Sequence, residues 1–200
     1  IFLFSVVAIG QNSQLSQAEQ AHFIKDVAGK AKGLKTLSSD FTQTKHIKLM
    51  ENKSVSKGKL YYMAPNVLKW EYSTPYNYII VFRENQLHIN DDGDKSVTSL
   101  RANKLMEKLI SLISGSVNGK LVSDHENFEV SFSKESNSVT AHVIPKDDSI
   151  KQMFHEIIMV FDQENILNSV RLMEDGGDYT HIEFKNIRIN TALDQSVFQN

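Results

Sequence analysis

The side chains with the potential for catalysis or metal binding are spread along this chain without a recognisable motif. Seven histidines occur, and none of them pair at the i, i+4 spacing of a zinc-protease helix. Ser123, Asp124 and His125 have the residue types of a catalytic triad, but adjacency in sequence is not triad geometry. The sequence also lacks a GxSxG nucleophile elbow and the glycine-rich phosphate loops. It therefore predicts no metal site, no cofactor and no enzyme.

The acidic run 91–94 (DDGD) is similar to part of a calcium loop. An EF-hand needs ligands at spaced positions and a closing glutamate, and the run lacks both. Gly93 permits the positive φ that a tight hairpin turn requires. We therefore expect a hairpin between strands at 86–90 and 95–98.

Apolar side chains give a stronger pattern than the polar ones. Successive residues of a strand point to opposite faces. Leu68, Trp70 and Tyr72 therefore share one face of a predicted strand, and Lys69 and Glu71 occupy the other. This face carries two aromatic rings, which is typical of a core or of an apolar binding surface.

Neighbouring strands extend this apolar face. In the strand that follows, either residues 79 and 81 or residues 80 and 82 point the same way, and we take the first pair. An ordinary solid core would show the same pattern. The candidate apolar surface comprises Phe41, Leu60, Tyr62, Leu68, Trp70, Tyr72, Ile79 and Val81.

Two segments are predicted to be helical. Ser16 and Glu19 have capping-box spacing, and apolar residues then recur at helical intervals as far as Gly33. Residues 101–114 are apolar over much of a helix circumference and are followed by Gly115, which is typical of a buried or lid-like helix.

The rest of the chain alternates with period two between turn signals, which predicts about eleven antiparallel strands. So many strands should twist and curl, and a wide half-closed sheet holds a ligand rather than only its own side chains. The expected fold class is α+β: a strongly curved antiparallel half-barrel with an apolar cavity covered by helices. The strand ranges are 41–49, 57–63, 67–72, 76–82, the 86–98 hairpin, 120–123, 128–133, 139–144, 153–161, 167–173 and 179–189.

Composition narrows the class of protein. A chain of 200 residues favours one domain or at most two, and a net charge of −2 gives no basic surplus for nucleic acid. We expect a monomer with no nucleic-acid partner. The absence of cysteine removes disulfides, thiolate metal sites and the lipidated N-terminal cysteine of a bacterial lipoprotein.

The first residues predict export. Residues 1–9 are apolar and uncharged, and Ala8 and Gly10 are small residues at the −3 and −1 positions of a cleavage before Gln11. We expect residues 1–10 to be the remnant of a signal peptide and residues 11–200 to form one domain. The alternative is a buried N-terminal strand.

Four motifs in order carry a resemblance to a known family. They are FTQ at 41–43, GKLYY at 58–62, PNVLKWEY at 65–72, and Pro75. Residues 165–198 extend the similarity through YTHIEF at 179–184, whereas residues 95–133 match only in pattern. Over most of its length the chain resembles the LolA-like family of periplasmic outer-membrane lipoprotein carriers.

The resemblance implies a function and a set of partners. It implies a periplasmic chaperone whose apolar cavity takes lipoprotein acyl chains from an inner-membrane release complex and delivers them to an outer-membrane acceptor. The candidate apolar surface would then be the lipid-binding surface of the cavity, and the two predicted helices would be lids over it. The lid residues would be Ile24, Val27, Leu105, Met106, Leu109 and Ile110.

One position departs from the family pattern. Many members have an arginine directly before the proline of the third motif, and it is thought to hold the lid; here Ala64 stands there. Another cation, Arg83 or Lys69, would have to replace it, or packing alone must hold the lid. The absence of cysteine favours the soluble carrier over the lipid-anchored acceptor of the same fold. The alternative function is a carrier or sensor of another amphiphile, such as a glycolipid, a pigment intermediate or a mislocalised lipoprotein.

Overall fold

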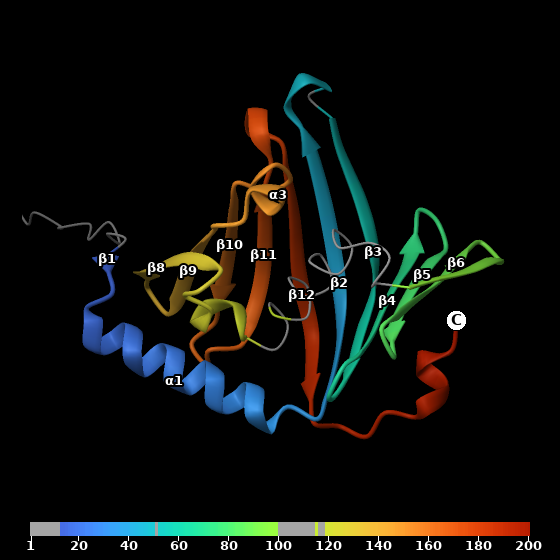
Figure 1. Ribbon diagram of the computed structural model, residues 1–200, viewed down its shortest axis with the longest axis horizontal. Helices are drawn as coiled ribbons and strands as arrows, with labels where there is room; N and C mark the ends of the chain where they lie inside the picture. Colours follow the sequence, from blue (N-terminus) through green and yellow to red (C-terminus); the bar gives the residue numbers. More distant parts are fainter. Residues whose placement is uncertain (1–12, 51, 100–114, 116–118) are drawn as a thin grey trace, which may run out of the picture.

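Short strands joined by tight turns build a strongly curved, unclosed antiparallel sheet (Figure 1). The computed structural model describes residues 13–50, 52–99, 115 and 119–200. Within them the sheet has twelve strands in the order β1-β8-β9-β10-β11-β12-β2-β3-β4-β5-β6-β7. The expected signal-peptide remnant at 1–10 and the expected helix at 101–114 lie outside the described residues.

Two meanders make up the sheet, and pairing of β12 with β2 joins them. The first contains β2 (Thr36–Ile47), β3 (Asn52–Met63), β4 (Val67–Thr74), β5 (Tyr78–Arg83), β6 (Gln86–Asp91) and β7 (Asp94–Ser99). The second contains β8 (Phe128–Glu135), β9 (Ser138–Pro145), β10 (Glu156–Phe161), β11 (Leu167–Met173) and β12 (Tyr179–Ile189), with the short β1 (Ser13–Gln14) beside β8. The expected curved antiparallel sheet is therefore confirmed.

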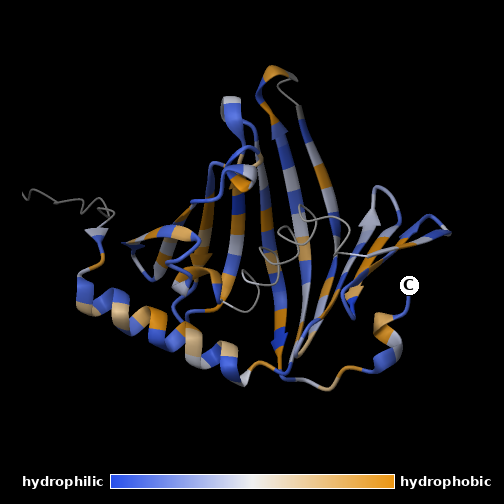
Figure 2. Cartoon of the chain, in the orientation of Figure 1, coloured by the Kyte–Doolittle hydropathy of each residue, from blue (hydrophilic) through white to orange (hydrophobic). Residues whose placement is uncertain are grey.

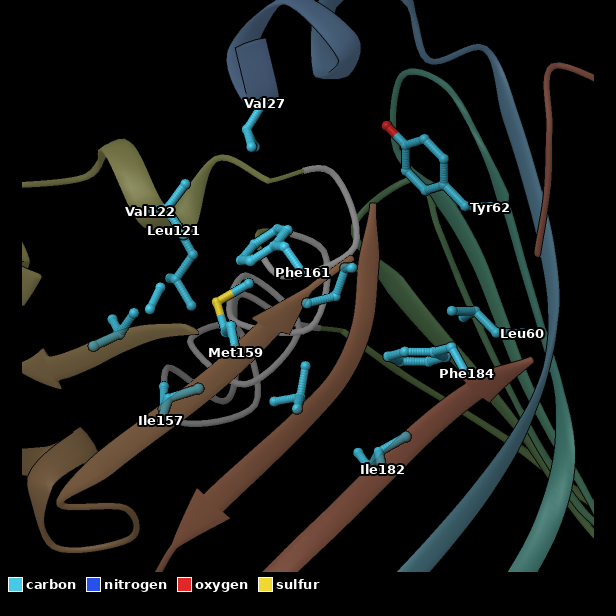
Figure 3. Close-up of a cluster of buried hydrophobic side chains, with 14 of the residues drawn as sticks. Val27, Leu60, Tyr62, Leu121, Val122, Ile157, Met159, Phe161, Ile182 and Phe184 are labelled. Atoms are coloured by element: carbon cyan, nitrogen blue, oxygen red, sulfur yellow. The ribbon is translucent and has the colours of Figure 1, made fainter. Parts of the chain in front are cut away.

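Alternation of side chains decides which face of the sheet is buried. Along the strands, apolar and polar residues follow one another (Figure 2). Ile157, Met159 and Phe161 of β10 and Ile182 and Phe184 of β12 point into the space that the sheet encloses (Figure 3). One hydrophobic cluster on this concave face extends across both meanders.

The helix α1 (Gln17–Gly33) crosses the ends of the second meander (Figure 1). Its N-terminus carries the predicted capping box: the Ser16 side chain accepts from the Glu19 backbone, and the Glu19 carboxylate accepts from the Ser16 N–H at 2.9 Å. Such reciprocal bonds satisfy helix-end donors that otherwise have no partner. The Ser16 hydroxyl also donates to the Glu19 carboxylate at 2.7 Å, and this bond together with the one from the Ser16 backbone N–H lowers the pKa of Glu19.

Short helical segments connect and close the meanders. Residues 120–123 are not the expected strand, because Leu121–Ser123 form the 3₁₀ turn η3. Leu121 and Val122 are adjacent and both buried, which a one-sided strand cannot achieve. The other segments are η1 (Lys48–Met50), α3 (Asp148–Lys151), η4 (Asp175–Gly177) and η5 (Gln195–Phe198).

The register of β5 corrects one expectation. Residues opposite each other in an antiparallel pair share a face, and Trp70 lies opposite Ile80 whereas Lys69 lies opposite Val81. Placing Ile79 and Val81 on the Trp70 face was therefore wrong. Val81 is nevertheless fully buried on the other face. The apolar run in β5 has buried residues on both faces, so the sequence alone does not show which of its residues share a face with Trp70.

Candidate functional site

A pocket of about 320 Å³ lies between the C-terminal half of α1 and the concave face of the sheet. This volume is at the low end of the roughly 300–1,000 Å³ that is typical of small-molecule sites. The walls come from α1, β2, β3, β12 and the β10–β11 turn. Its apolar lining includes Leu34, Leu37, Leu60, Phe161, Leu167 and Phe184.

The floor of the pocket continues into an aromatic cluster. The ring of Phe184 lies 6.4 Å from that of Trp70, whose ring is 4.4 Å from Phe41. Tyr72 meets Phe41 edge-on at 5.3 Å and donates a hydrogen bond to Gln43 Oε1 at 3.0 Å. Burial raises the pKa of Tyr72, so its hydroxyl is neutral at physiological pH. The cluster is uncharged and suits apolar ligands.

Polar groups at the pocket are confined to a few positions and are engaged with protein partners. Lys30 Nζ lies 2.6 Å from Asp26 Oδ2 and also donates to the carbonyl oxygen of Glu164. Asn165 Nδ2 donates to Asp26 Oδ2 at 2.8 Å. Hydrogen bonds from Lys30 and then Asn165 lower the pKa of Asp26, so this carboxylate remains ionised at neutral pH.

A second polar contact fixes the end of α1. Asn190 Nδ2 donates to the Gly33 carbonyl at 2.9 Å, and Asn190 Oδ1 accepts from the Lys35 N–H at 2.7 Å. Asn190 has a φ of 57°, a left-handed conformation that asparagine tolerates better than most residues. Lys30, Asn165 and Asn190 all line the pocket. Its interior is apolar, and its polar groups already have partners within the protein.

The predicted lipid-binding residues divide into three groups. Leu60 lines the pocket. Ile79 and Val81 face away from the Trp70 cluster. The others belong to the concave hydrophobic cluster or pack against it: Phe41, Tyr62, Leu68, Trp70 and Tyr72.

The predicted lid residues are only partly described. Val27 lines the pocket, and Ile24 is partly buried against the core. Leu105, Met106, Leu109 and Ile110 lie outside the described residues. Sequence reasoning did not single out Phe161 and Phe184, although the alternation of β10 and β12 marks them as inward-facing.

Neither cation considered as a substitute for the family arginine faces α1. Lys69 is buried on the outer face and lies 3.2 Å from Glu71, and Arg83 contacts His88 at 3.3 Å. Ala64 itself donates its N–H to the Lys35 carbonyl at 2.8 Å, just beyond the end of α1. The polar contacts of α1 described above come from Asn165, Glu164 and Asn190 instead.

Two further properties concern the described residues. None of them form a group of three or more histidine and carboxylate side chains with the geometry to hold a metal ion. Among their helices, none has the length and hydropathy needed to cross a bilayer.

The sequence matches a known protein family over most of its length. Residues 32–200 match the family described as "Outer membrane lipoprotein carrier protein LolA". The "Outer-membrane lipoprotein carrier protein" of Chromobacterium violaceum is 28% identical over 189 residues, covering 92% of this chain and 85% of that protein.

Solved structures share the fold at low identity. The Mycobacterium tuberculosis lipoprotein LppX is similar with a TM-score of 0.50 and 12% identity, covering 90% of this chain and 99% of that one. A chain in the Pseudomonas aeruginosa MucA/MucB complex gives a TM-score of 0.51 and 11% identity, covering 91% and 61%. These likenesses show the fold alone. The match over residues 32–200 shows more: this chain belongs to the LolA family of outer membrane lipoprotein carrier proteins.

Proposed function

We propose that this chain is a periplasmic chaperone that carries lipoproteins from the inner to the outer membrane by sheltering their acyl chains. The observation that carries the proposal is the apolar pocket beneath α1, whose lining residues Leu60 and Phe184 continue into the Trp70 cluster. The family match and the carrier names of relatives support it. In this proposal an inner-membrane release complex supplies the lipoprotein, and an outer-membrane acceptor receives it.

The thermodynamics of acyl chains require this kind of surface. Each buried CH₂ group contributes about 0.8 kcal/mol, so a triacylated anchor is very costly to expose to water. A carrier must replace the membrane at nearly equal free energy and still release its load. Many non-directional contacts achieve this better than a polar pocket does. The aliphatic and aromatic lining meets that requirement.

The volume of the pocket implies a movement on loading. About 320 Å³ is at the low end for one small ligand, so several acyl chains require its walls to separate. The sheet side of the pocket belongs to the continuous hydrogen-bonded ladder of β2, β3 and β12. The helix side is attached by side chains and loops. We therefore expect α1 to be the wall that yields.

Filling the pocket should block acyl binding. Ala31 lines the pocket from α1, and Ala31→Phe puts a ring into the space while leaving the sheet intact. Trp70 is the single tryptophan of the chain, so quenching of its fluorescence by a brominated phospholipid reports acyl chains near the cluster. We expect quenching in the wild type and at least about a fivefold weaker affinity in Ala31→Phe, because overpacking typically costs about 1–3 kcal/mol.

A matched change elsewhere on α1 controls for helix effects. Ala21 is exposed and lies outside the pocket lining, so Ala21→Phe should bind as the wild type does. Equal affinity of Ala31→Phe and wild type would show that this pocket does not hold acyl chains. Quenching by brominated lipid without any handling of lipoprotein would favour a carrier or sensor of another amphiphile.

A further inference from the structure

Three tyrosines gather at one end of the concave aromatic surface. The Tyr72 ring lies 5.5 Å from the ring of Tyr76 and 6.4 Å from that of Tyr78. Tyr72 belongs to β4, Tyr78 begins β5, and Tyr76 lies in the turn between the two strands. Tyr78 pairs with Tyr72 across the ladder, so the two share a face of the sheet. We call these three residues the tyrosine cluster.

The hydroxyl groups of the tyrosine cluster are only partly engaged with the protein. Tyr72 donates to Gln43 Oε1, and the Tyr76 hydroxyl lies 3.3 Å from Ser56 Oγ, where either atom can be the donor. Within the described part of the chain, the Tyr78 hydroxyl has no hydrogen-bond partner. A hydroxyl carries one donor and two acceptor positions. Tyr78, and Tyr76 when Ser56 donates to it, can therefore donate a hydrogen bond to a ligand.

A buried indole provides a further donor beside the cluster. Trp70 is 7% exposed, and among the residues that the structure describes its Nε1 atom forms no hydrogen bond of normal geometry. Burial and the neighbouring Tyr76 raise the pKa of Tyr72, and the nearby Trp70 indole and Gln43 amide partly oppose that rise. An indole N–H can only donate, and a buried donor without a partner is costly. This position therefore favours a ligand that brings an acceptor.

The tyrosine cluster lies about one acyl-chain length from the pocket. Ring-to-ring steps of 6.4, 6.4 and 5.5 Å lead from Phe184 in the pocket lining through Trp70 and Tyr72 to Tyr76. One leaflet of the hydrocarbon core of a bilayer is about 15 Å thick. Exposure rises along this path, from a buried Trp70 to a Tyr76 that is 49% exposed. An acyl chain that lies on these rings with its methyl end in the pocket has its polar end at the tyrosines.

The residue types of this cluster are those of the polar boundary of a membrane. Tyrosine and tryptophan are enriched where acyl chains meet headgroups, because an apolar ring there carries a polar tip. The ester and amide carbonyls at that boundary are neutral hydrogen-bond acceptors. Asp91 lies opposite Tyr78 in the β5–β6 ladder, and its negative charge disfavours an anionic group beside it. The cluster therefore fits a neutral carbonyl better than a phosphate.

We propose that Tyr76, Tyr78 and the Trp70 N–H bind the ester or amide carbonyls that join the acyl chains of the cargo to its polar part. This inference rests on the proposed acyl-binding function and adds an orientation to it. The chain ends point towards the pocket beneath α1, and the linkage lies at the β4–β5 turn. The apolar lining alone has no preference for either end of a chain, so the tyrosine cluster sets the direction.

Two lysophospholipids with the same chain and headgroup isolate the carbonyl. One has an ester linkage, and the other has an ether linkage that lacks the carbonyl oxygen. Each is titrated against the wild type loaded with a brominated phospholipid, and recovery of Trp70 fluorescence gives its affinity. We expect the ester lipid to bind about fivefold more tightly than the ether lipid, the factor of one typical hydrogen bond. Equal affinities of the two lipids would overturn the role of the tyrosine cluster.

Phenylalanine substitutions remove the hydroxyls and keep the rings. In the double variant Tyr76→Phe with Tyr78→Phe, the ester lipid should lose its advantage while the affinity for the ether lipid stays at the wild-type value. Tyr61→Phe is the matched control, because Tyr61 lies opposite Lys69 on the outer face, and it should keep the fivefold preference. An ester preference that persists in the double variant would contradict the proposal.

The same two lipids distinguish this inference from the function on which it rests. If both bind with equal affinity, the proposed acyl binding stands and the carbonyl site is wrong. If the brominated phospholipid does not quench Trp70 and neither lysophospholipid binds, the proposed acyl binding is wrong and the carbonyl site falls with it.

Discussion

Gly58→Ala is expected to destabilise the protein severely. An alanine Cβ at this position in β3 would overlap the backbone carbonyl of Glu71 in β4 and lie 2.7 Å from Cζ of Phe41. Overpacking costs about 1–3 kcal/mol when side chains can adjust. The obstacle here is backbone in a paired strand, so we expect a loss of at least about 3 kcal/mol. Urea unfolding monitored by circular dichroism measures it.

Gly29→Ala, the same substitution in α1, should change the stability in the opposite direction. Nothing lies within 4 Å of a Cβ at Gly29, and alanine favours helix over glycine by about 1 kcal/mol. This variant should therefore be slightly more stable than the wild type. Wild-type stability of Gly58→Ala would mean that β3 and β4 do not approach each other as described.

Phe23→Ala should release α1 from the sheet. Phe23 is 3% exposed and packs edge-on against one ring from β8 and one from β10. Removing a buried phenylalanine costs about 3–5 kcal/mol. With the helix anchor lost, the apolar surface beneath it becomes accessible, and exposed patches of this kind bind hydrophobic dyes. We expect a lower unfolding midpoint in urea together with increased dye fluorescence under native conditions.

Leu49→Ala is the control for this change. Leu49 is 98% exposed in η1, so its truncation should alter stability by less than about 0.5 kcal/mol and leave dye binding unchanged. Native dye fluorescence that stays at the wild-type level in Phe23→Ala would show that α1 does not cover an apolar surface.

Local signals in the sequence predicted the elements that depend on neighbouring residues. The Ser16–Glu19 capping box, the 91–94 hairpin turn and the shared face of Leu68 and Trp70 are all present. Each of these depends on residues only a few positions apart. The number of predicted antiparallel strands indicated the overall curvature, and the family resemblance implied the same half-barrel.

Features that depend on distant segments were harder to predict. The YIIVF run of β5 is apolar at every position, so only its pairing with β4 shows which residues share the Trp70 face. The 120–123 segment has only two apolar residues, Leu121 and Val122, and is too short to distinguish a strand from a 3₁₀ turn. The pocket lies between α1, β12 and the β10–β11 turn. Lys30 of α1 and Glu164 of that turn are in contact although 134 positions separate them in the sequence, and a local pattern cannot reveal such a contact.

A release assay tests most directly whether this chain carries lipoproteins. Membrane vesicles holding a triacylated lipoprotein and an inner-membrane release complex would be incubated with the wild type, Ala21→Phe and Ala31→Phe. We predict a soluble one-to-one complex with the wild type and with Ala21→Phe, and a strongly reduced yield with Ala31→Phe. Lipoprotein that stays in the membrane with the wild type, while the protein holds a different lipid by native mass spectrometry, would contradict the carrier function.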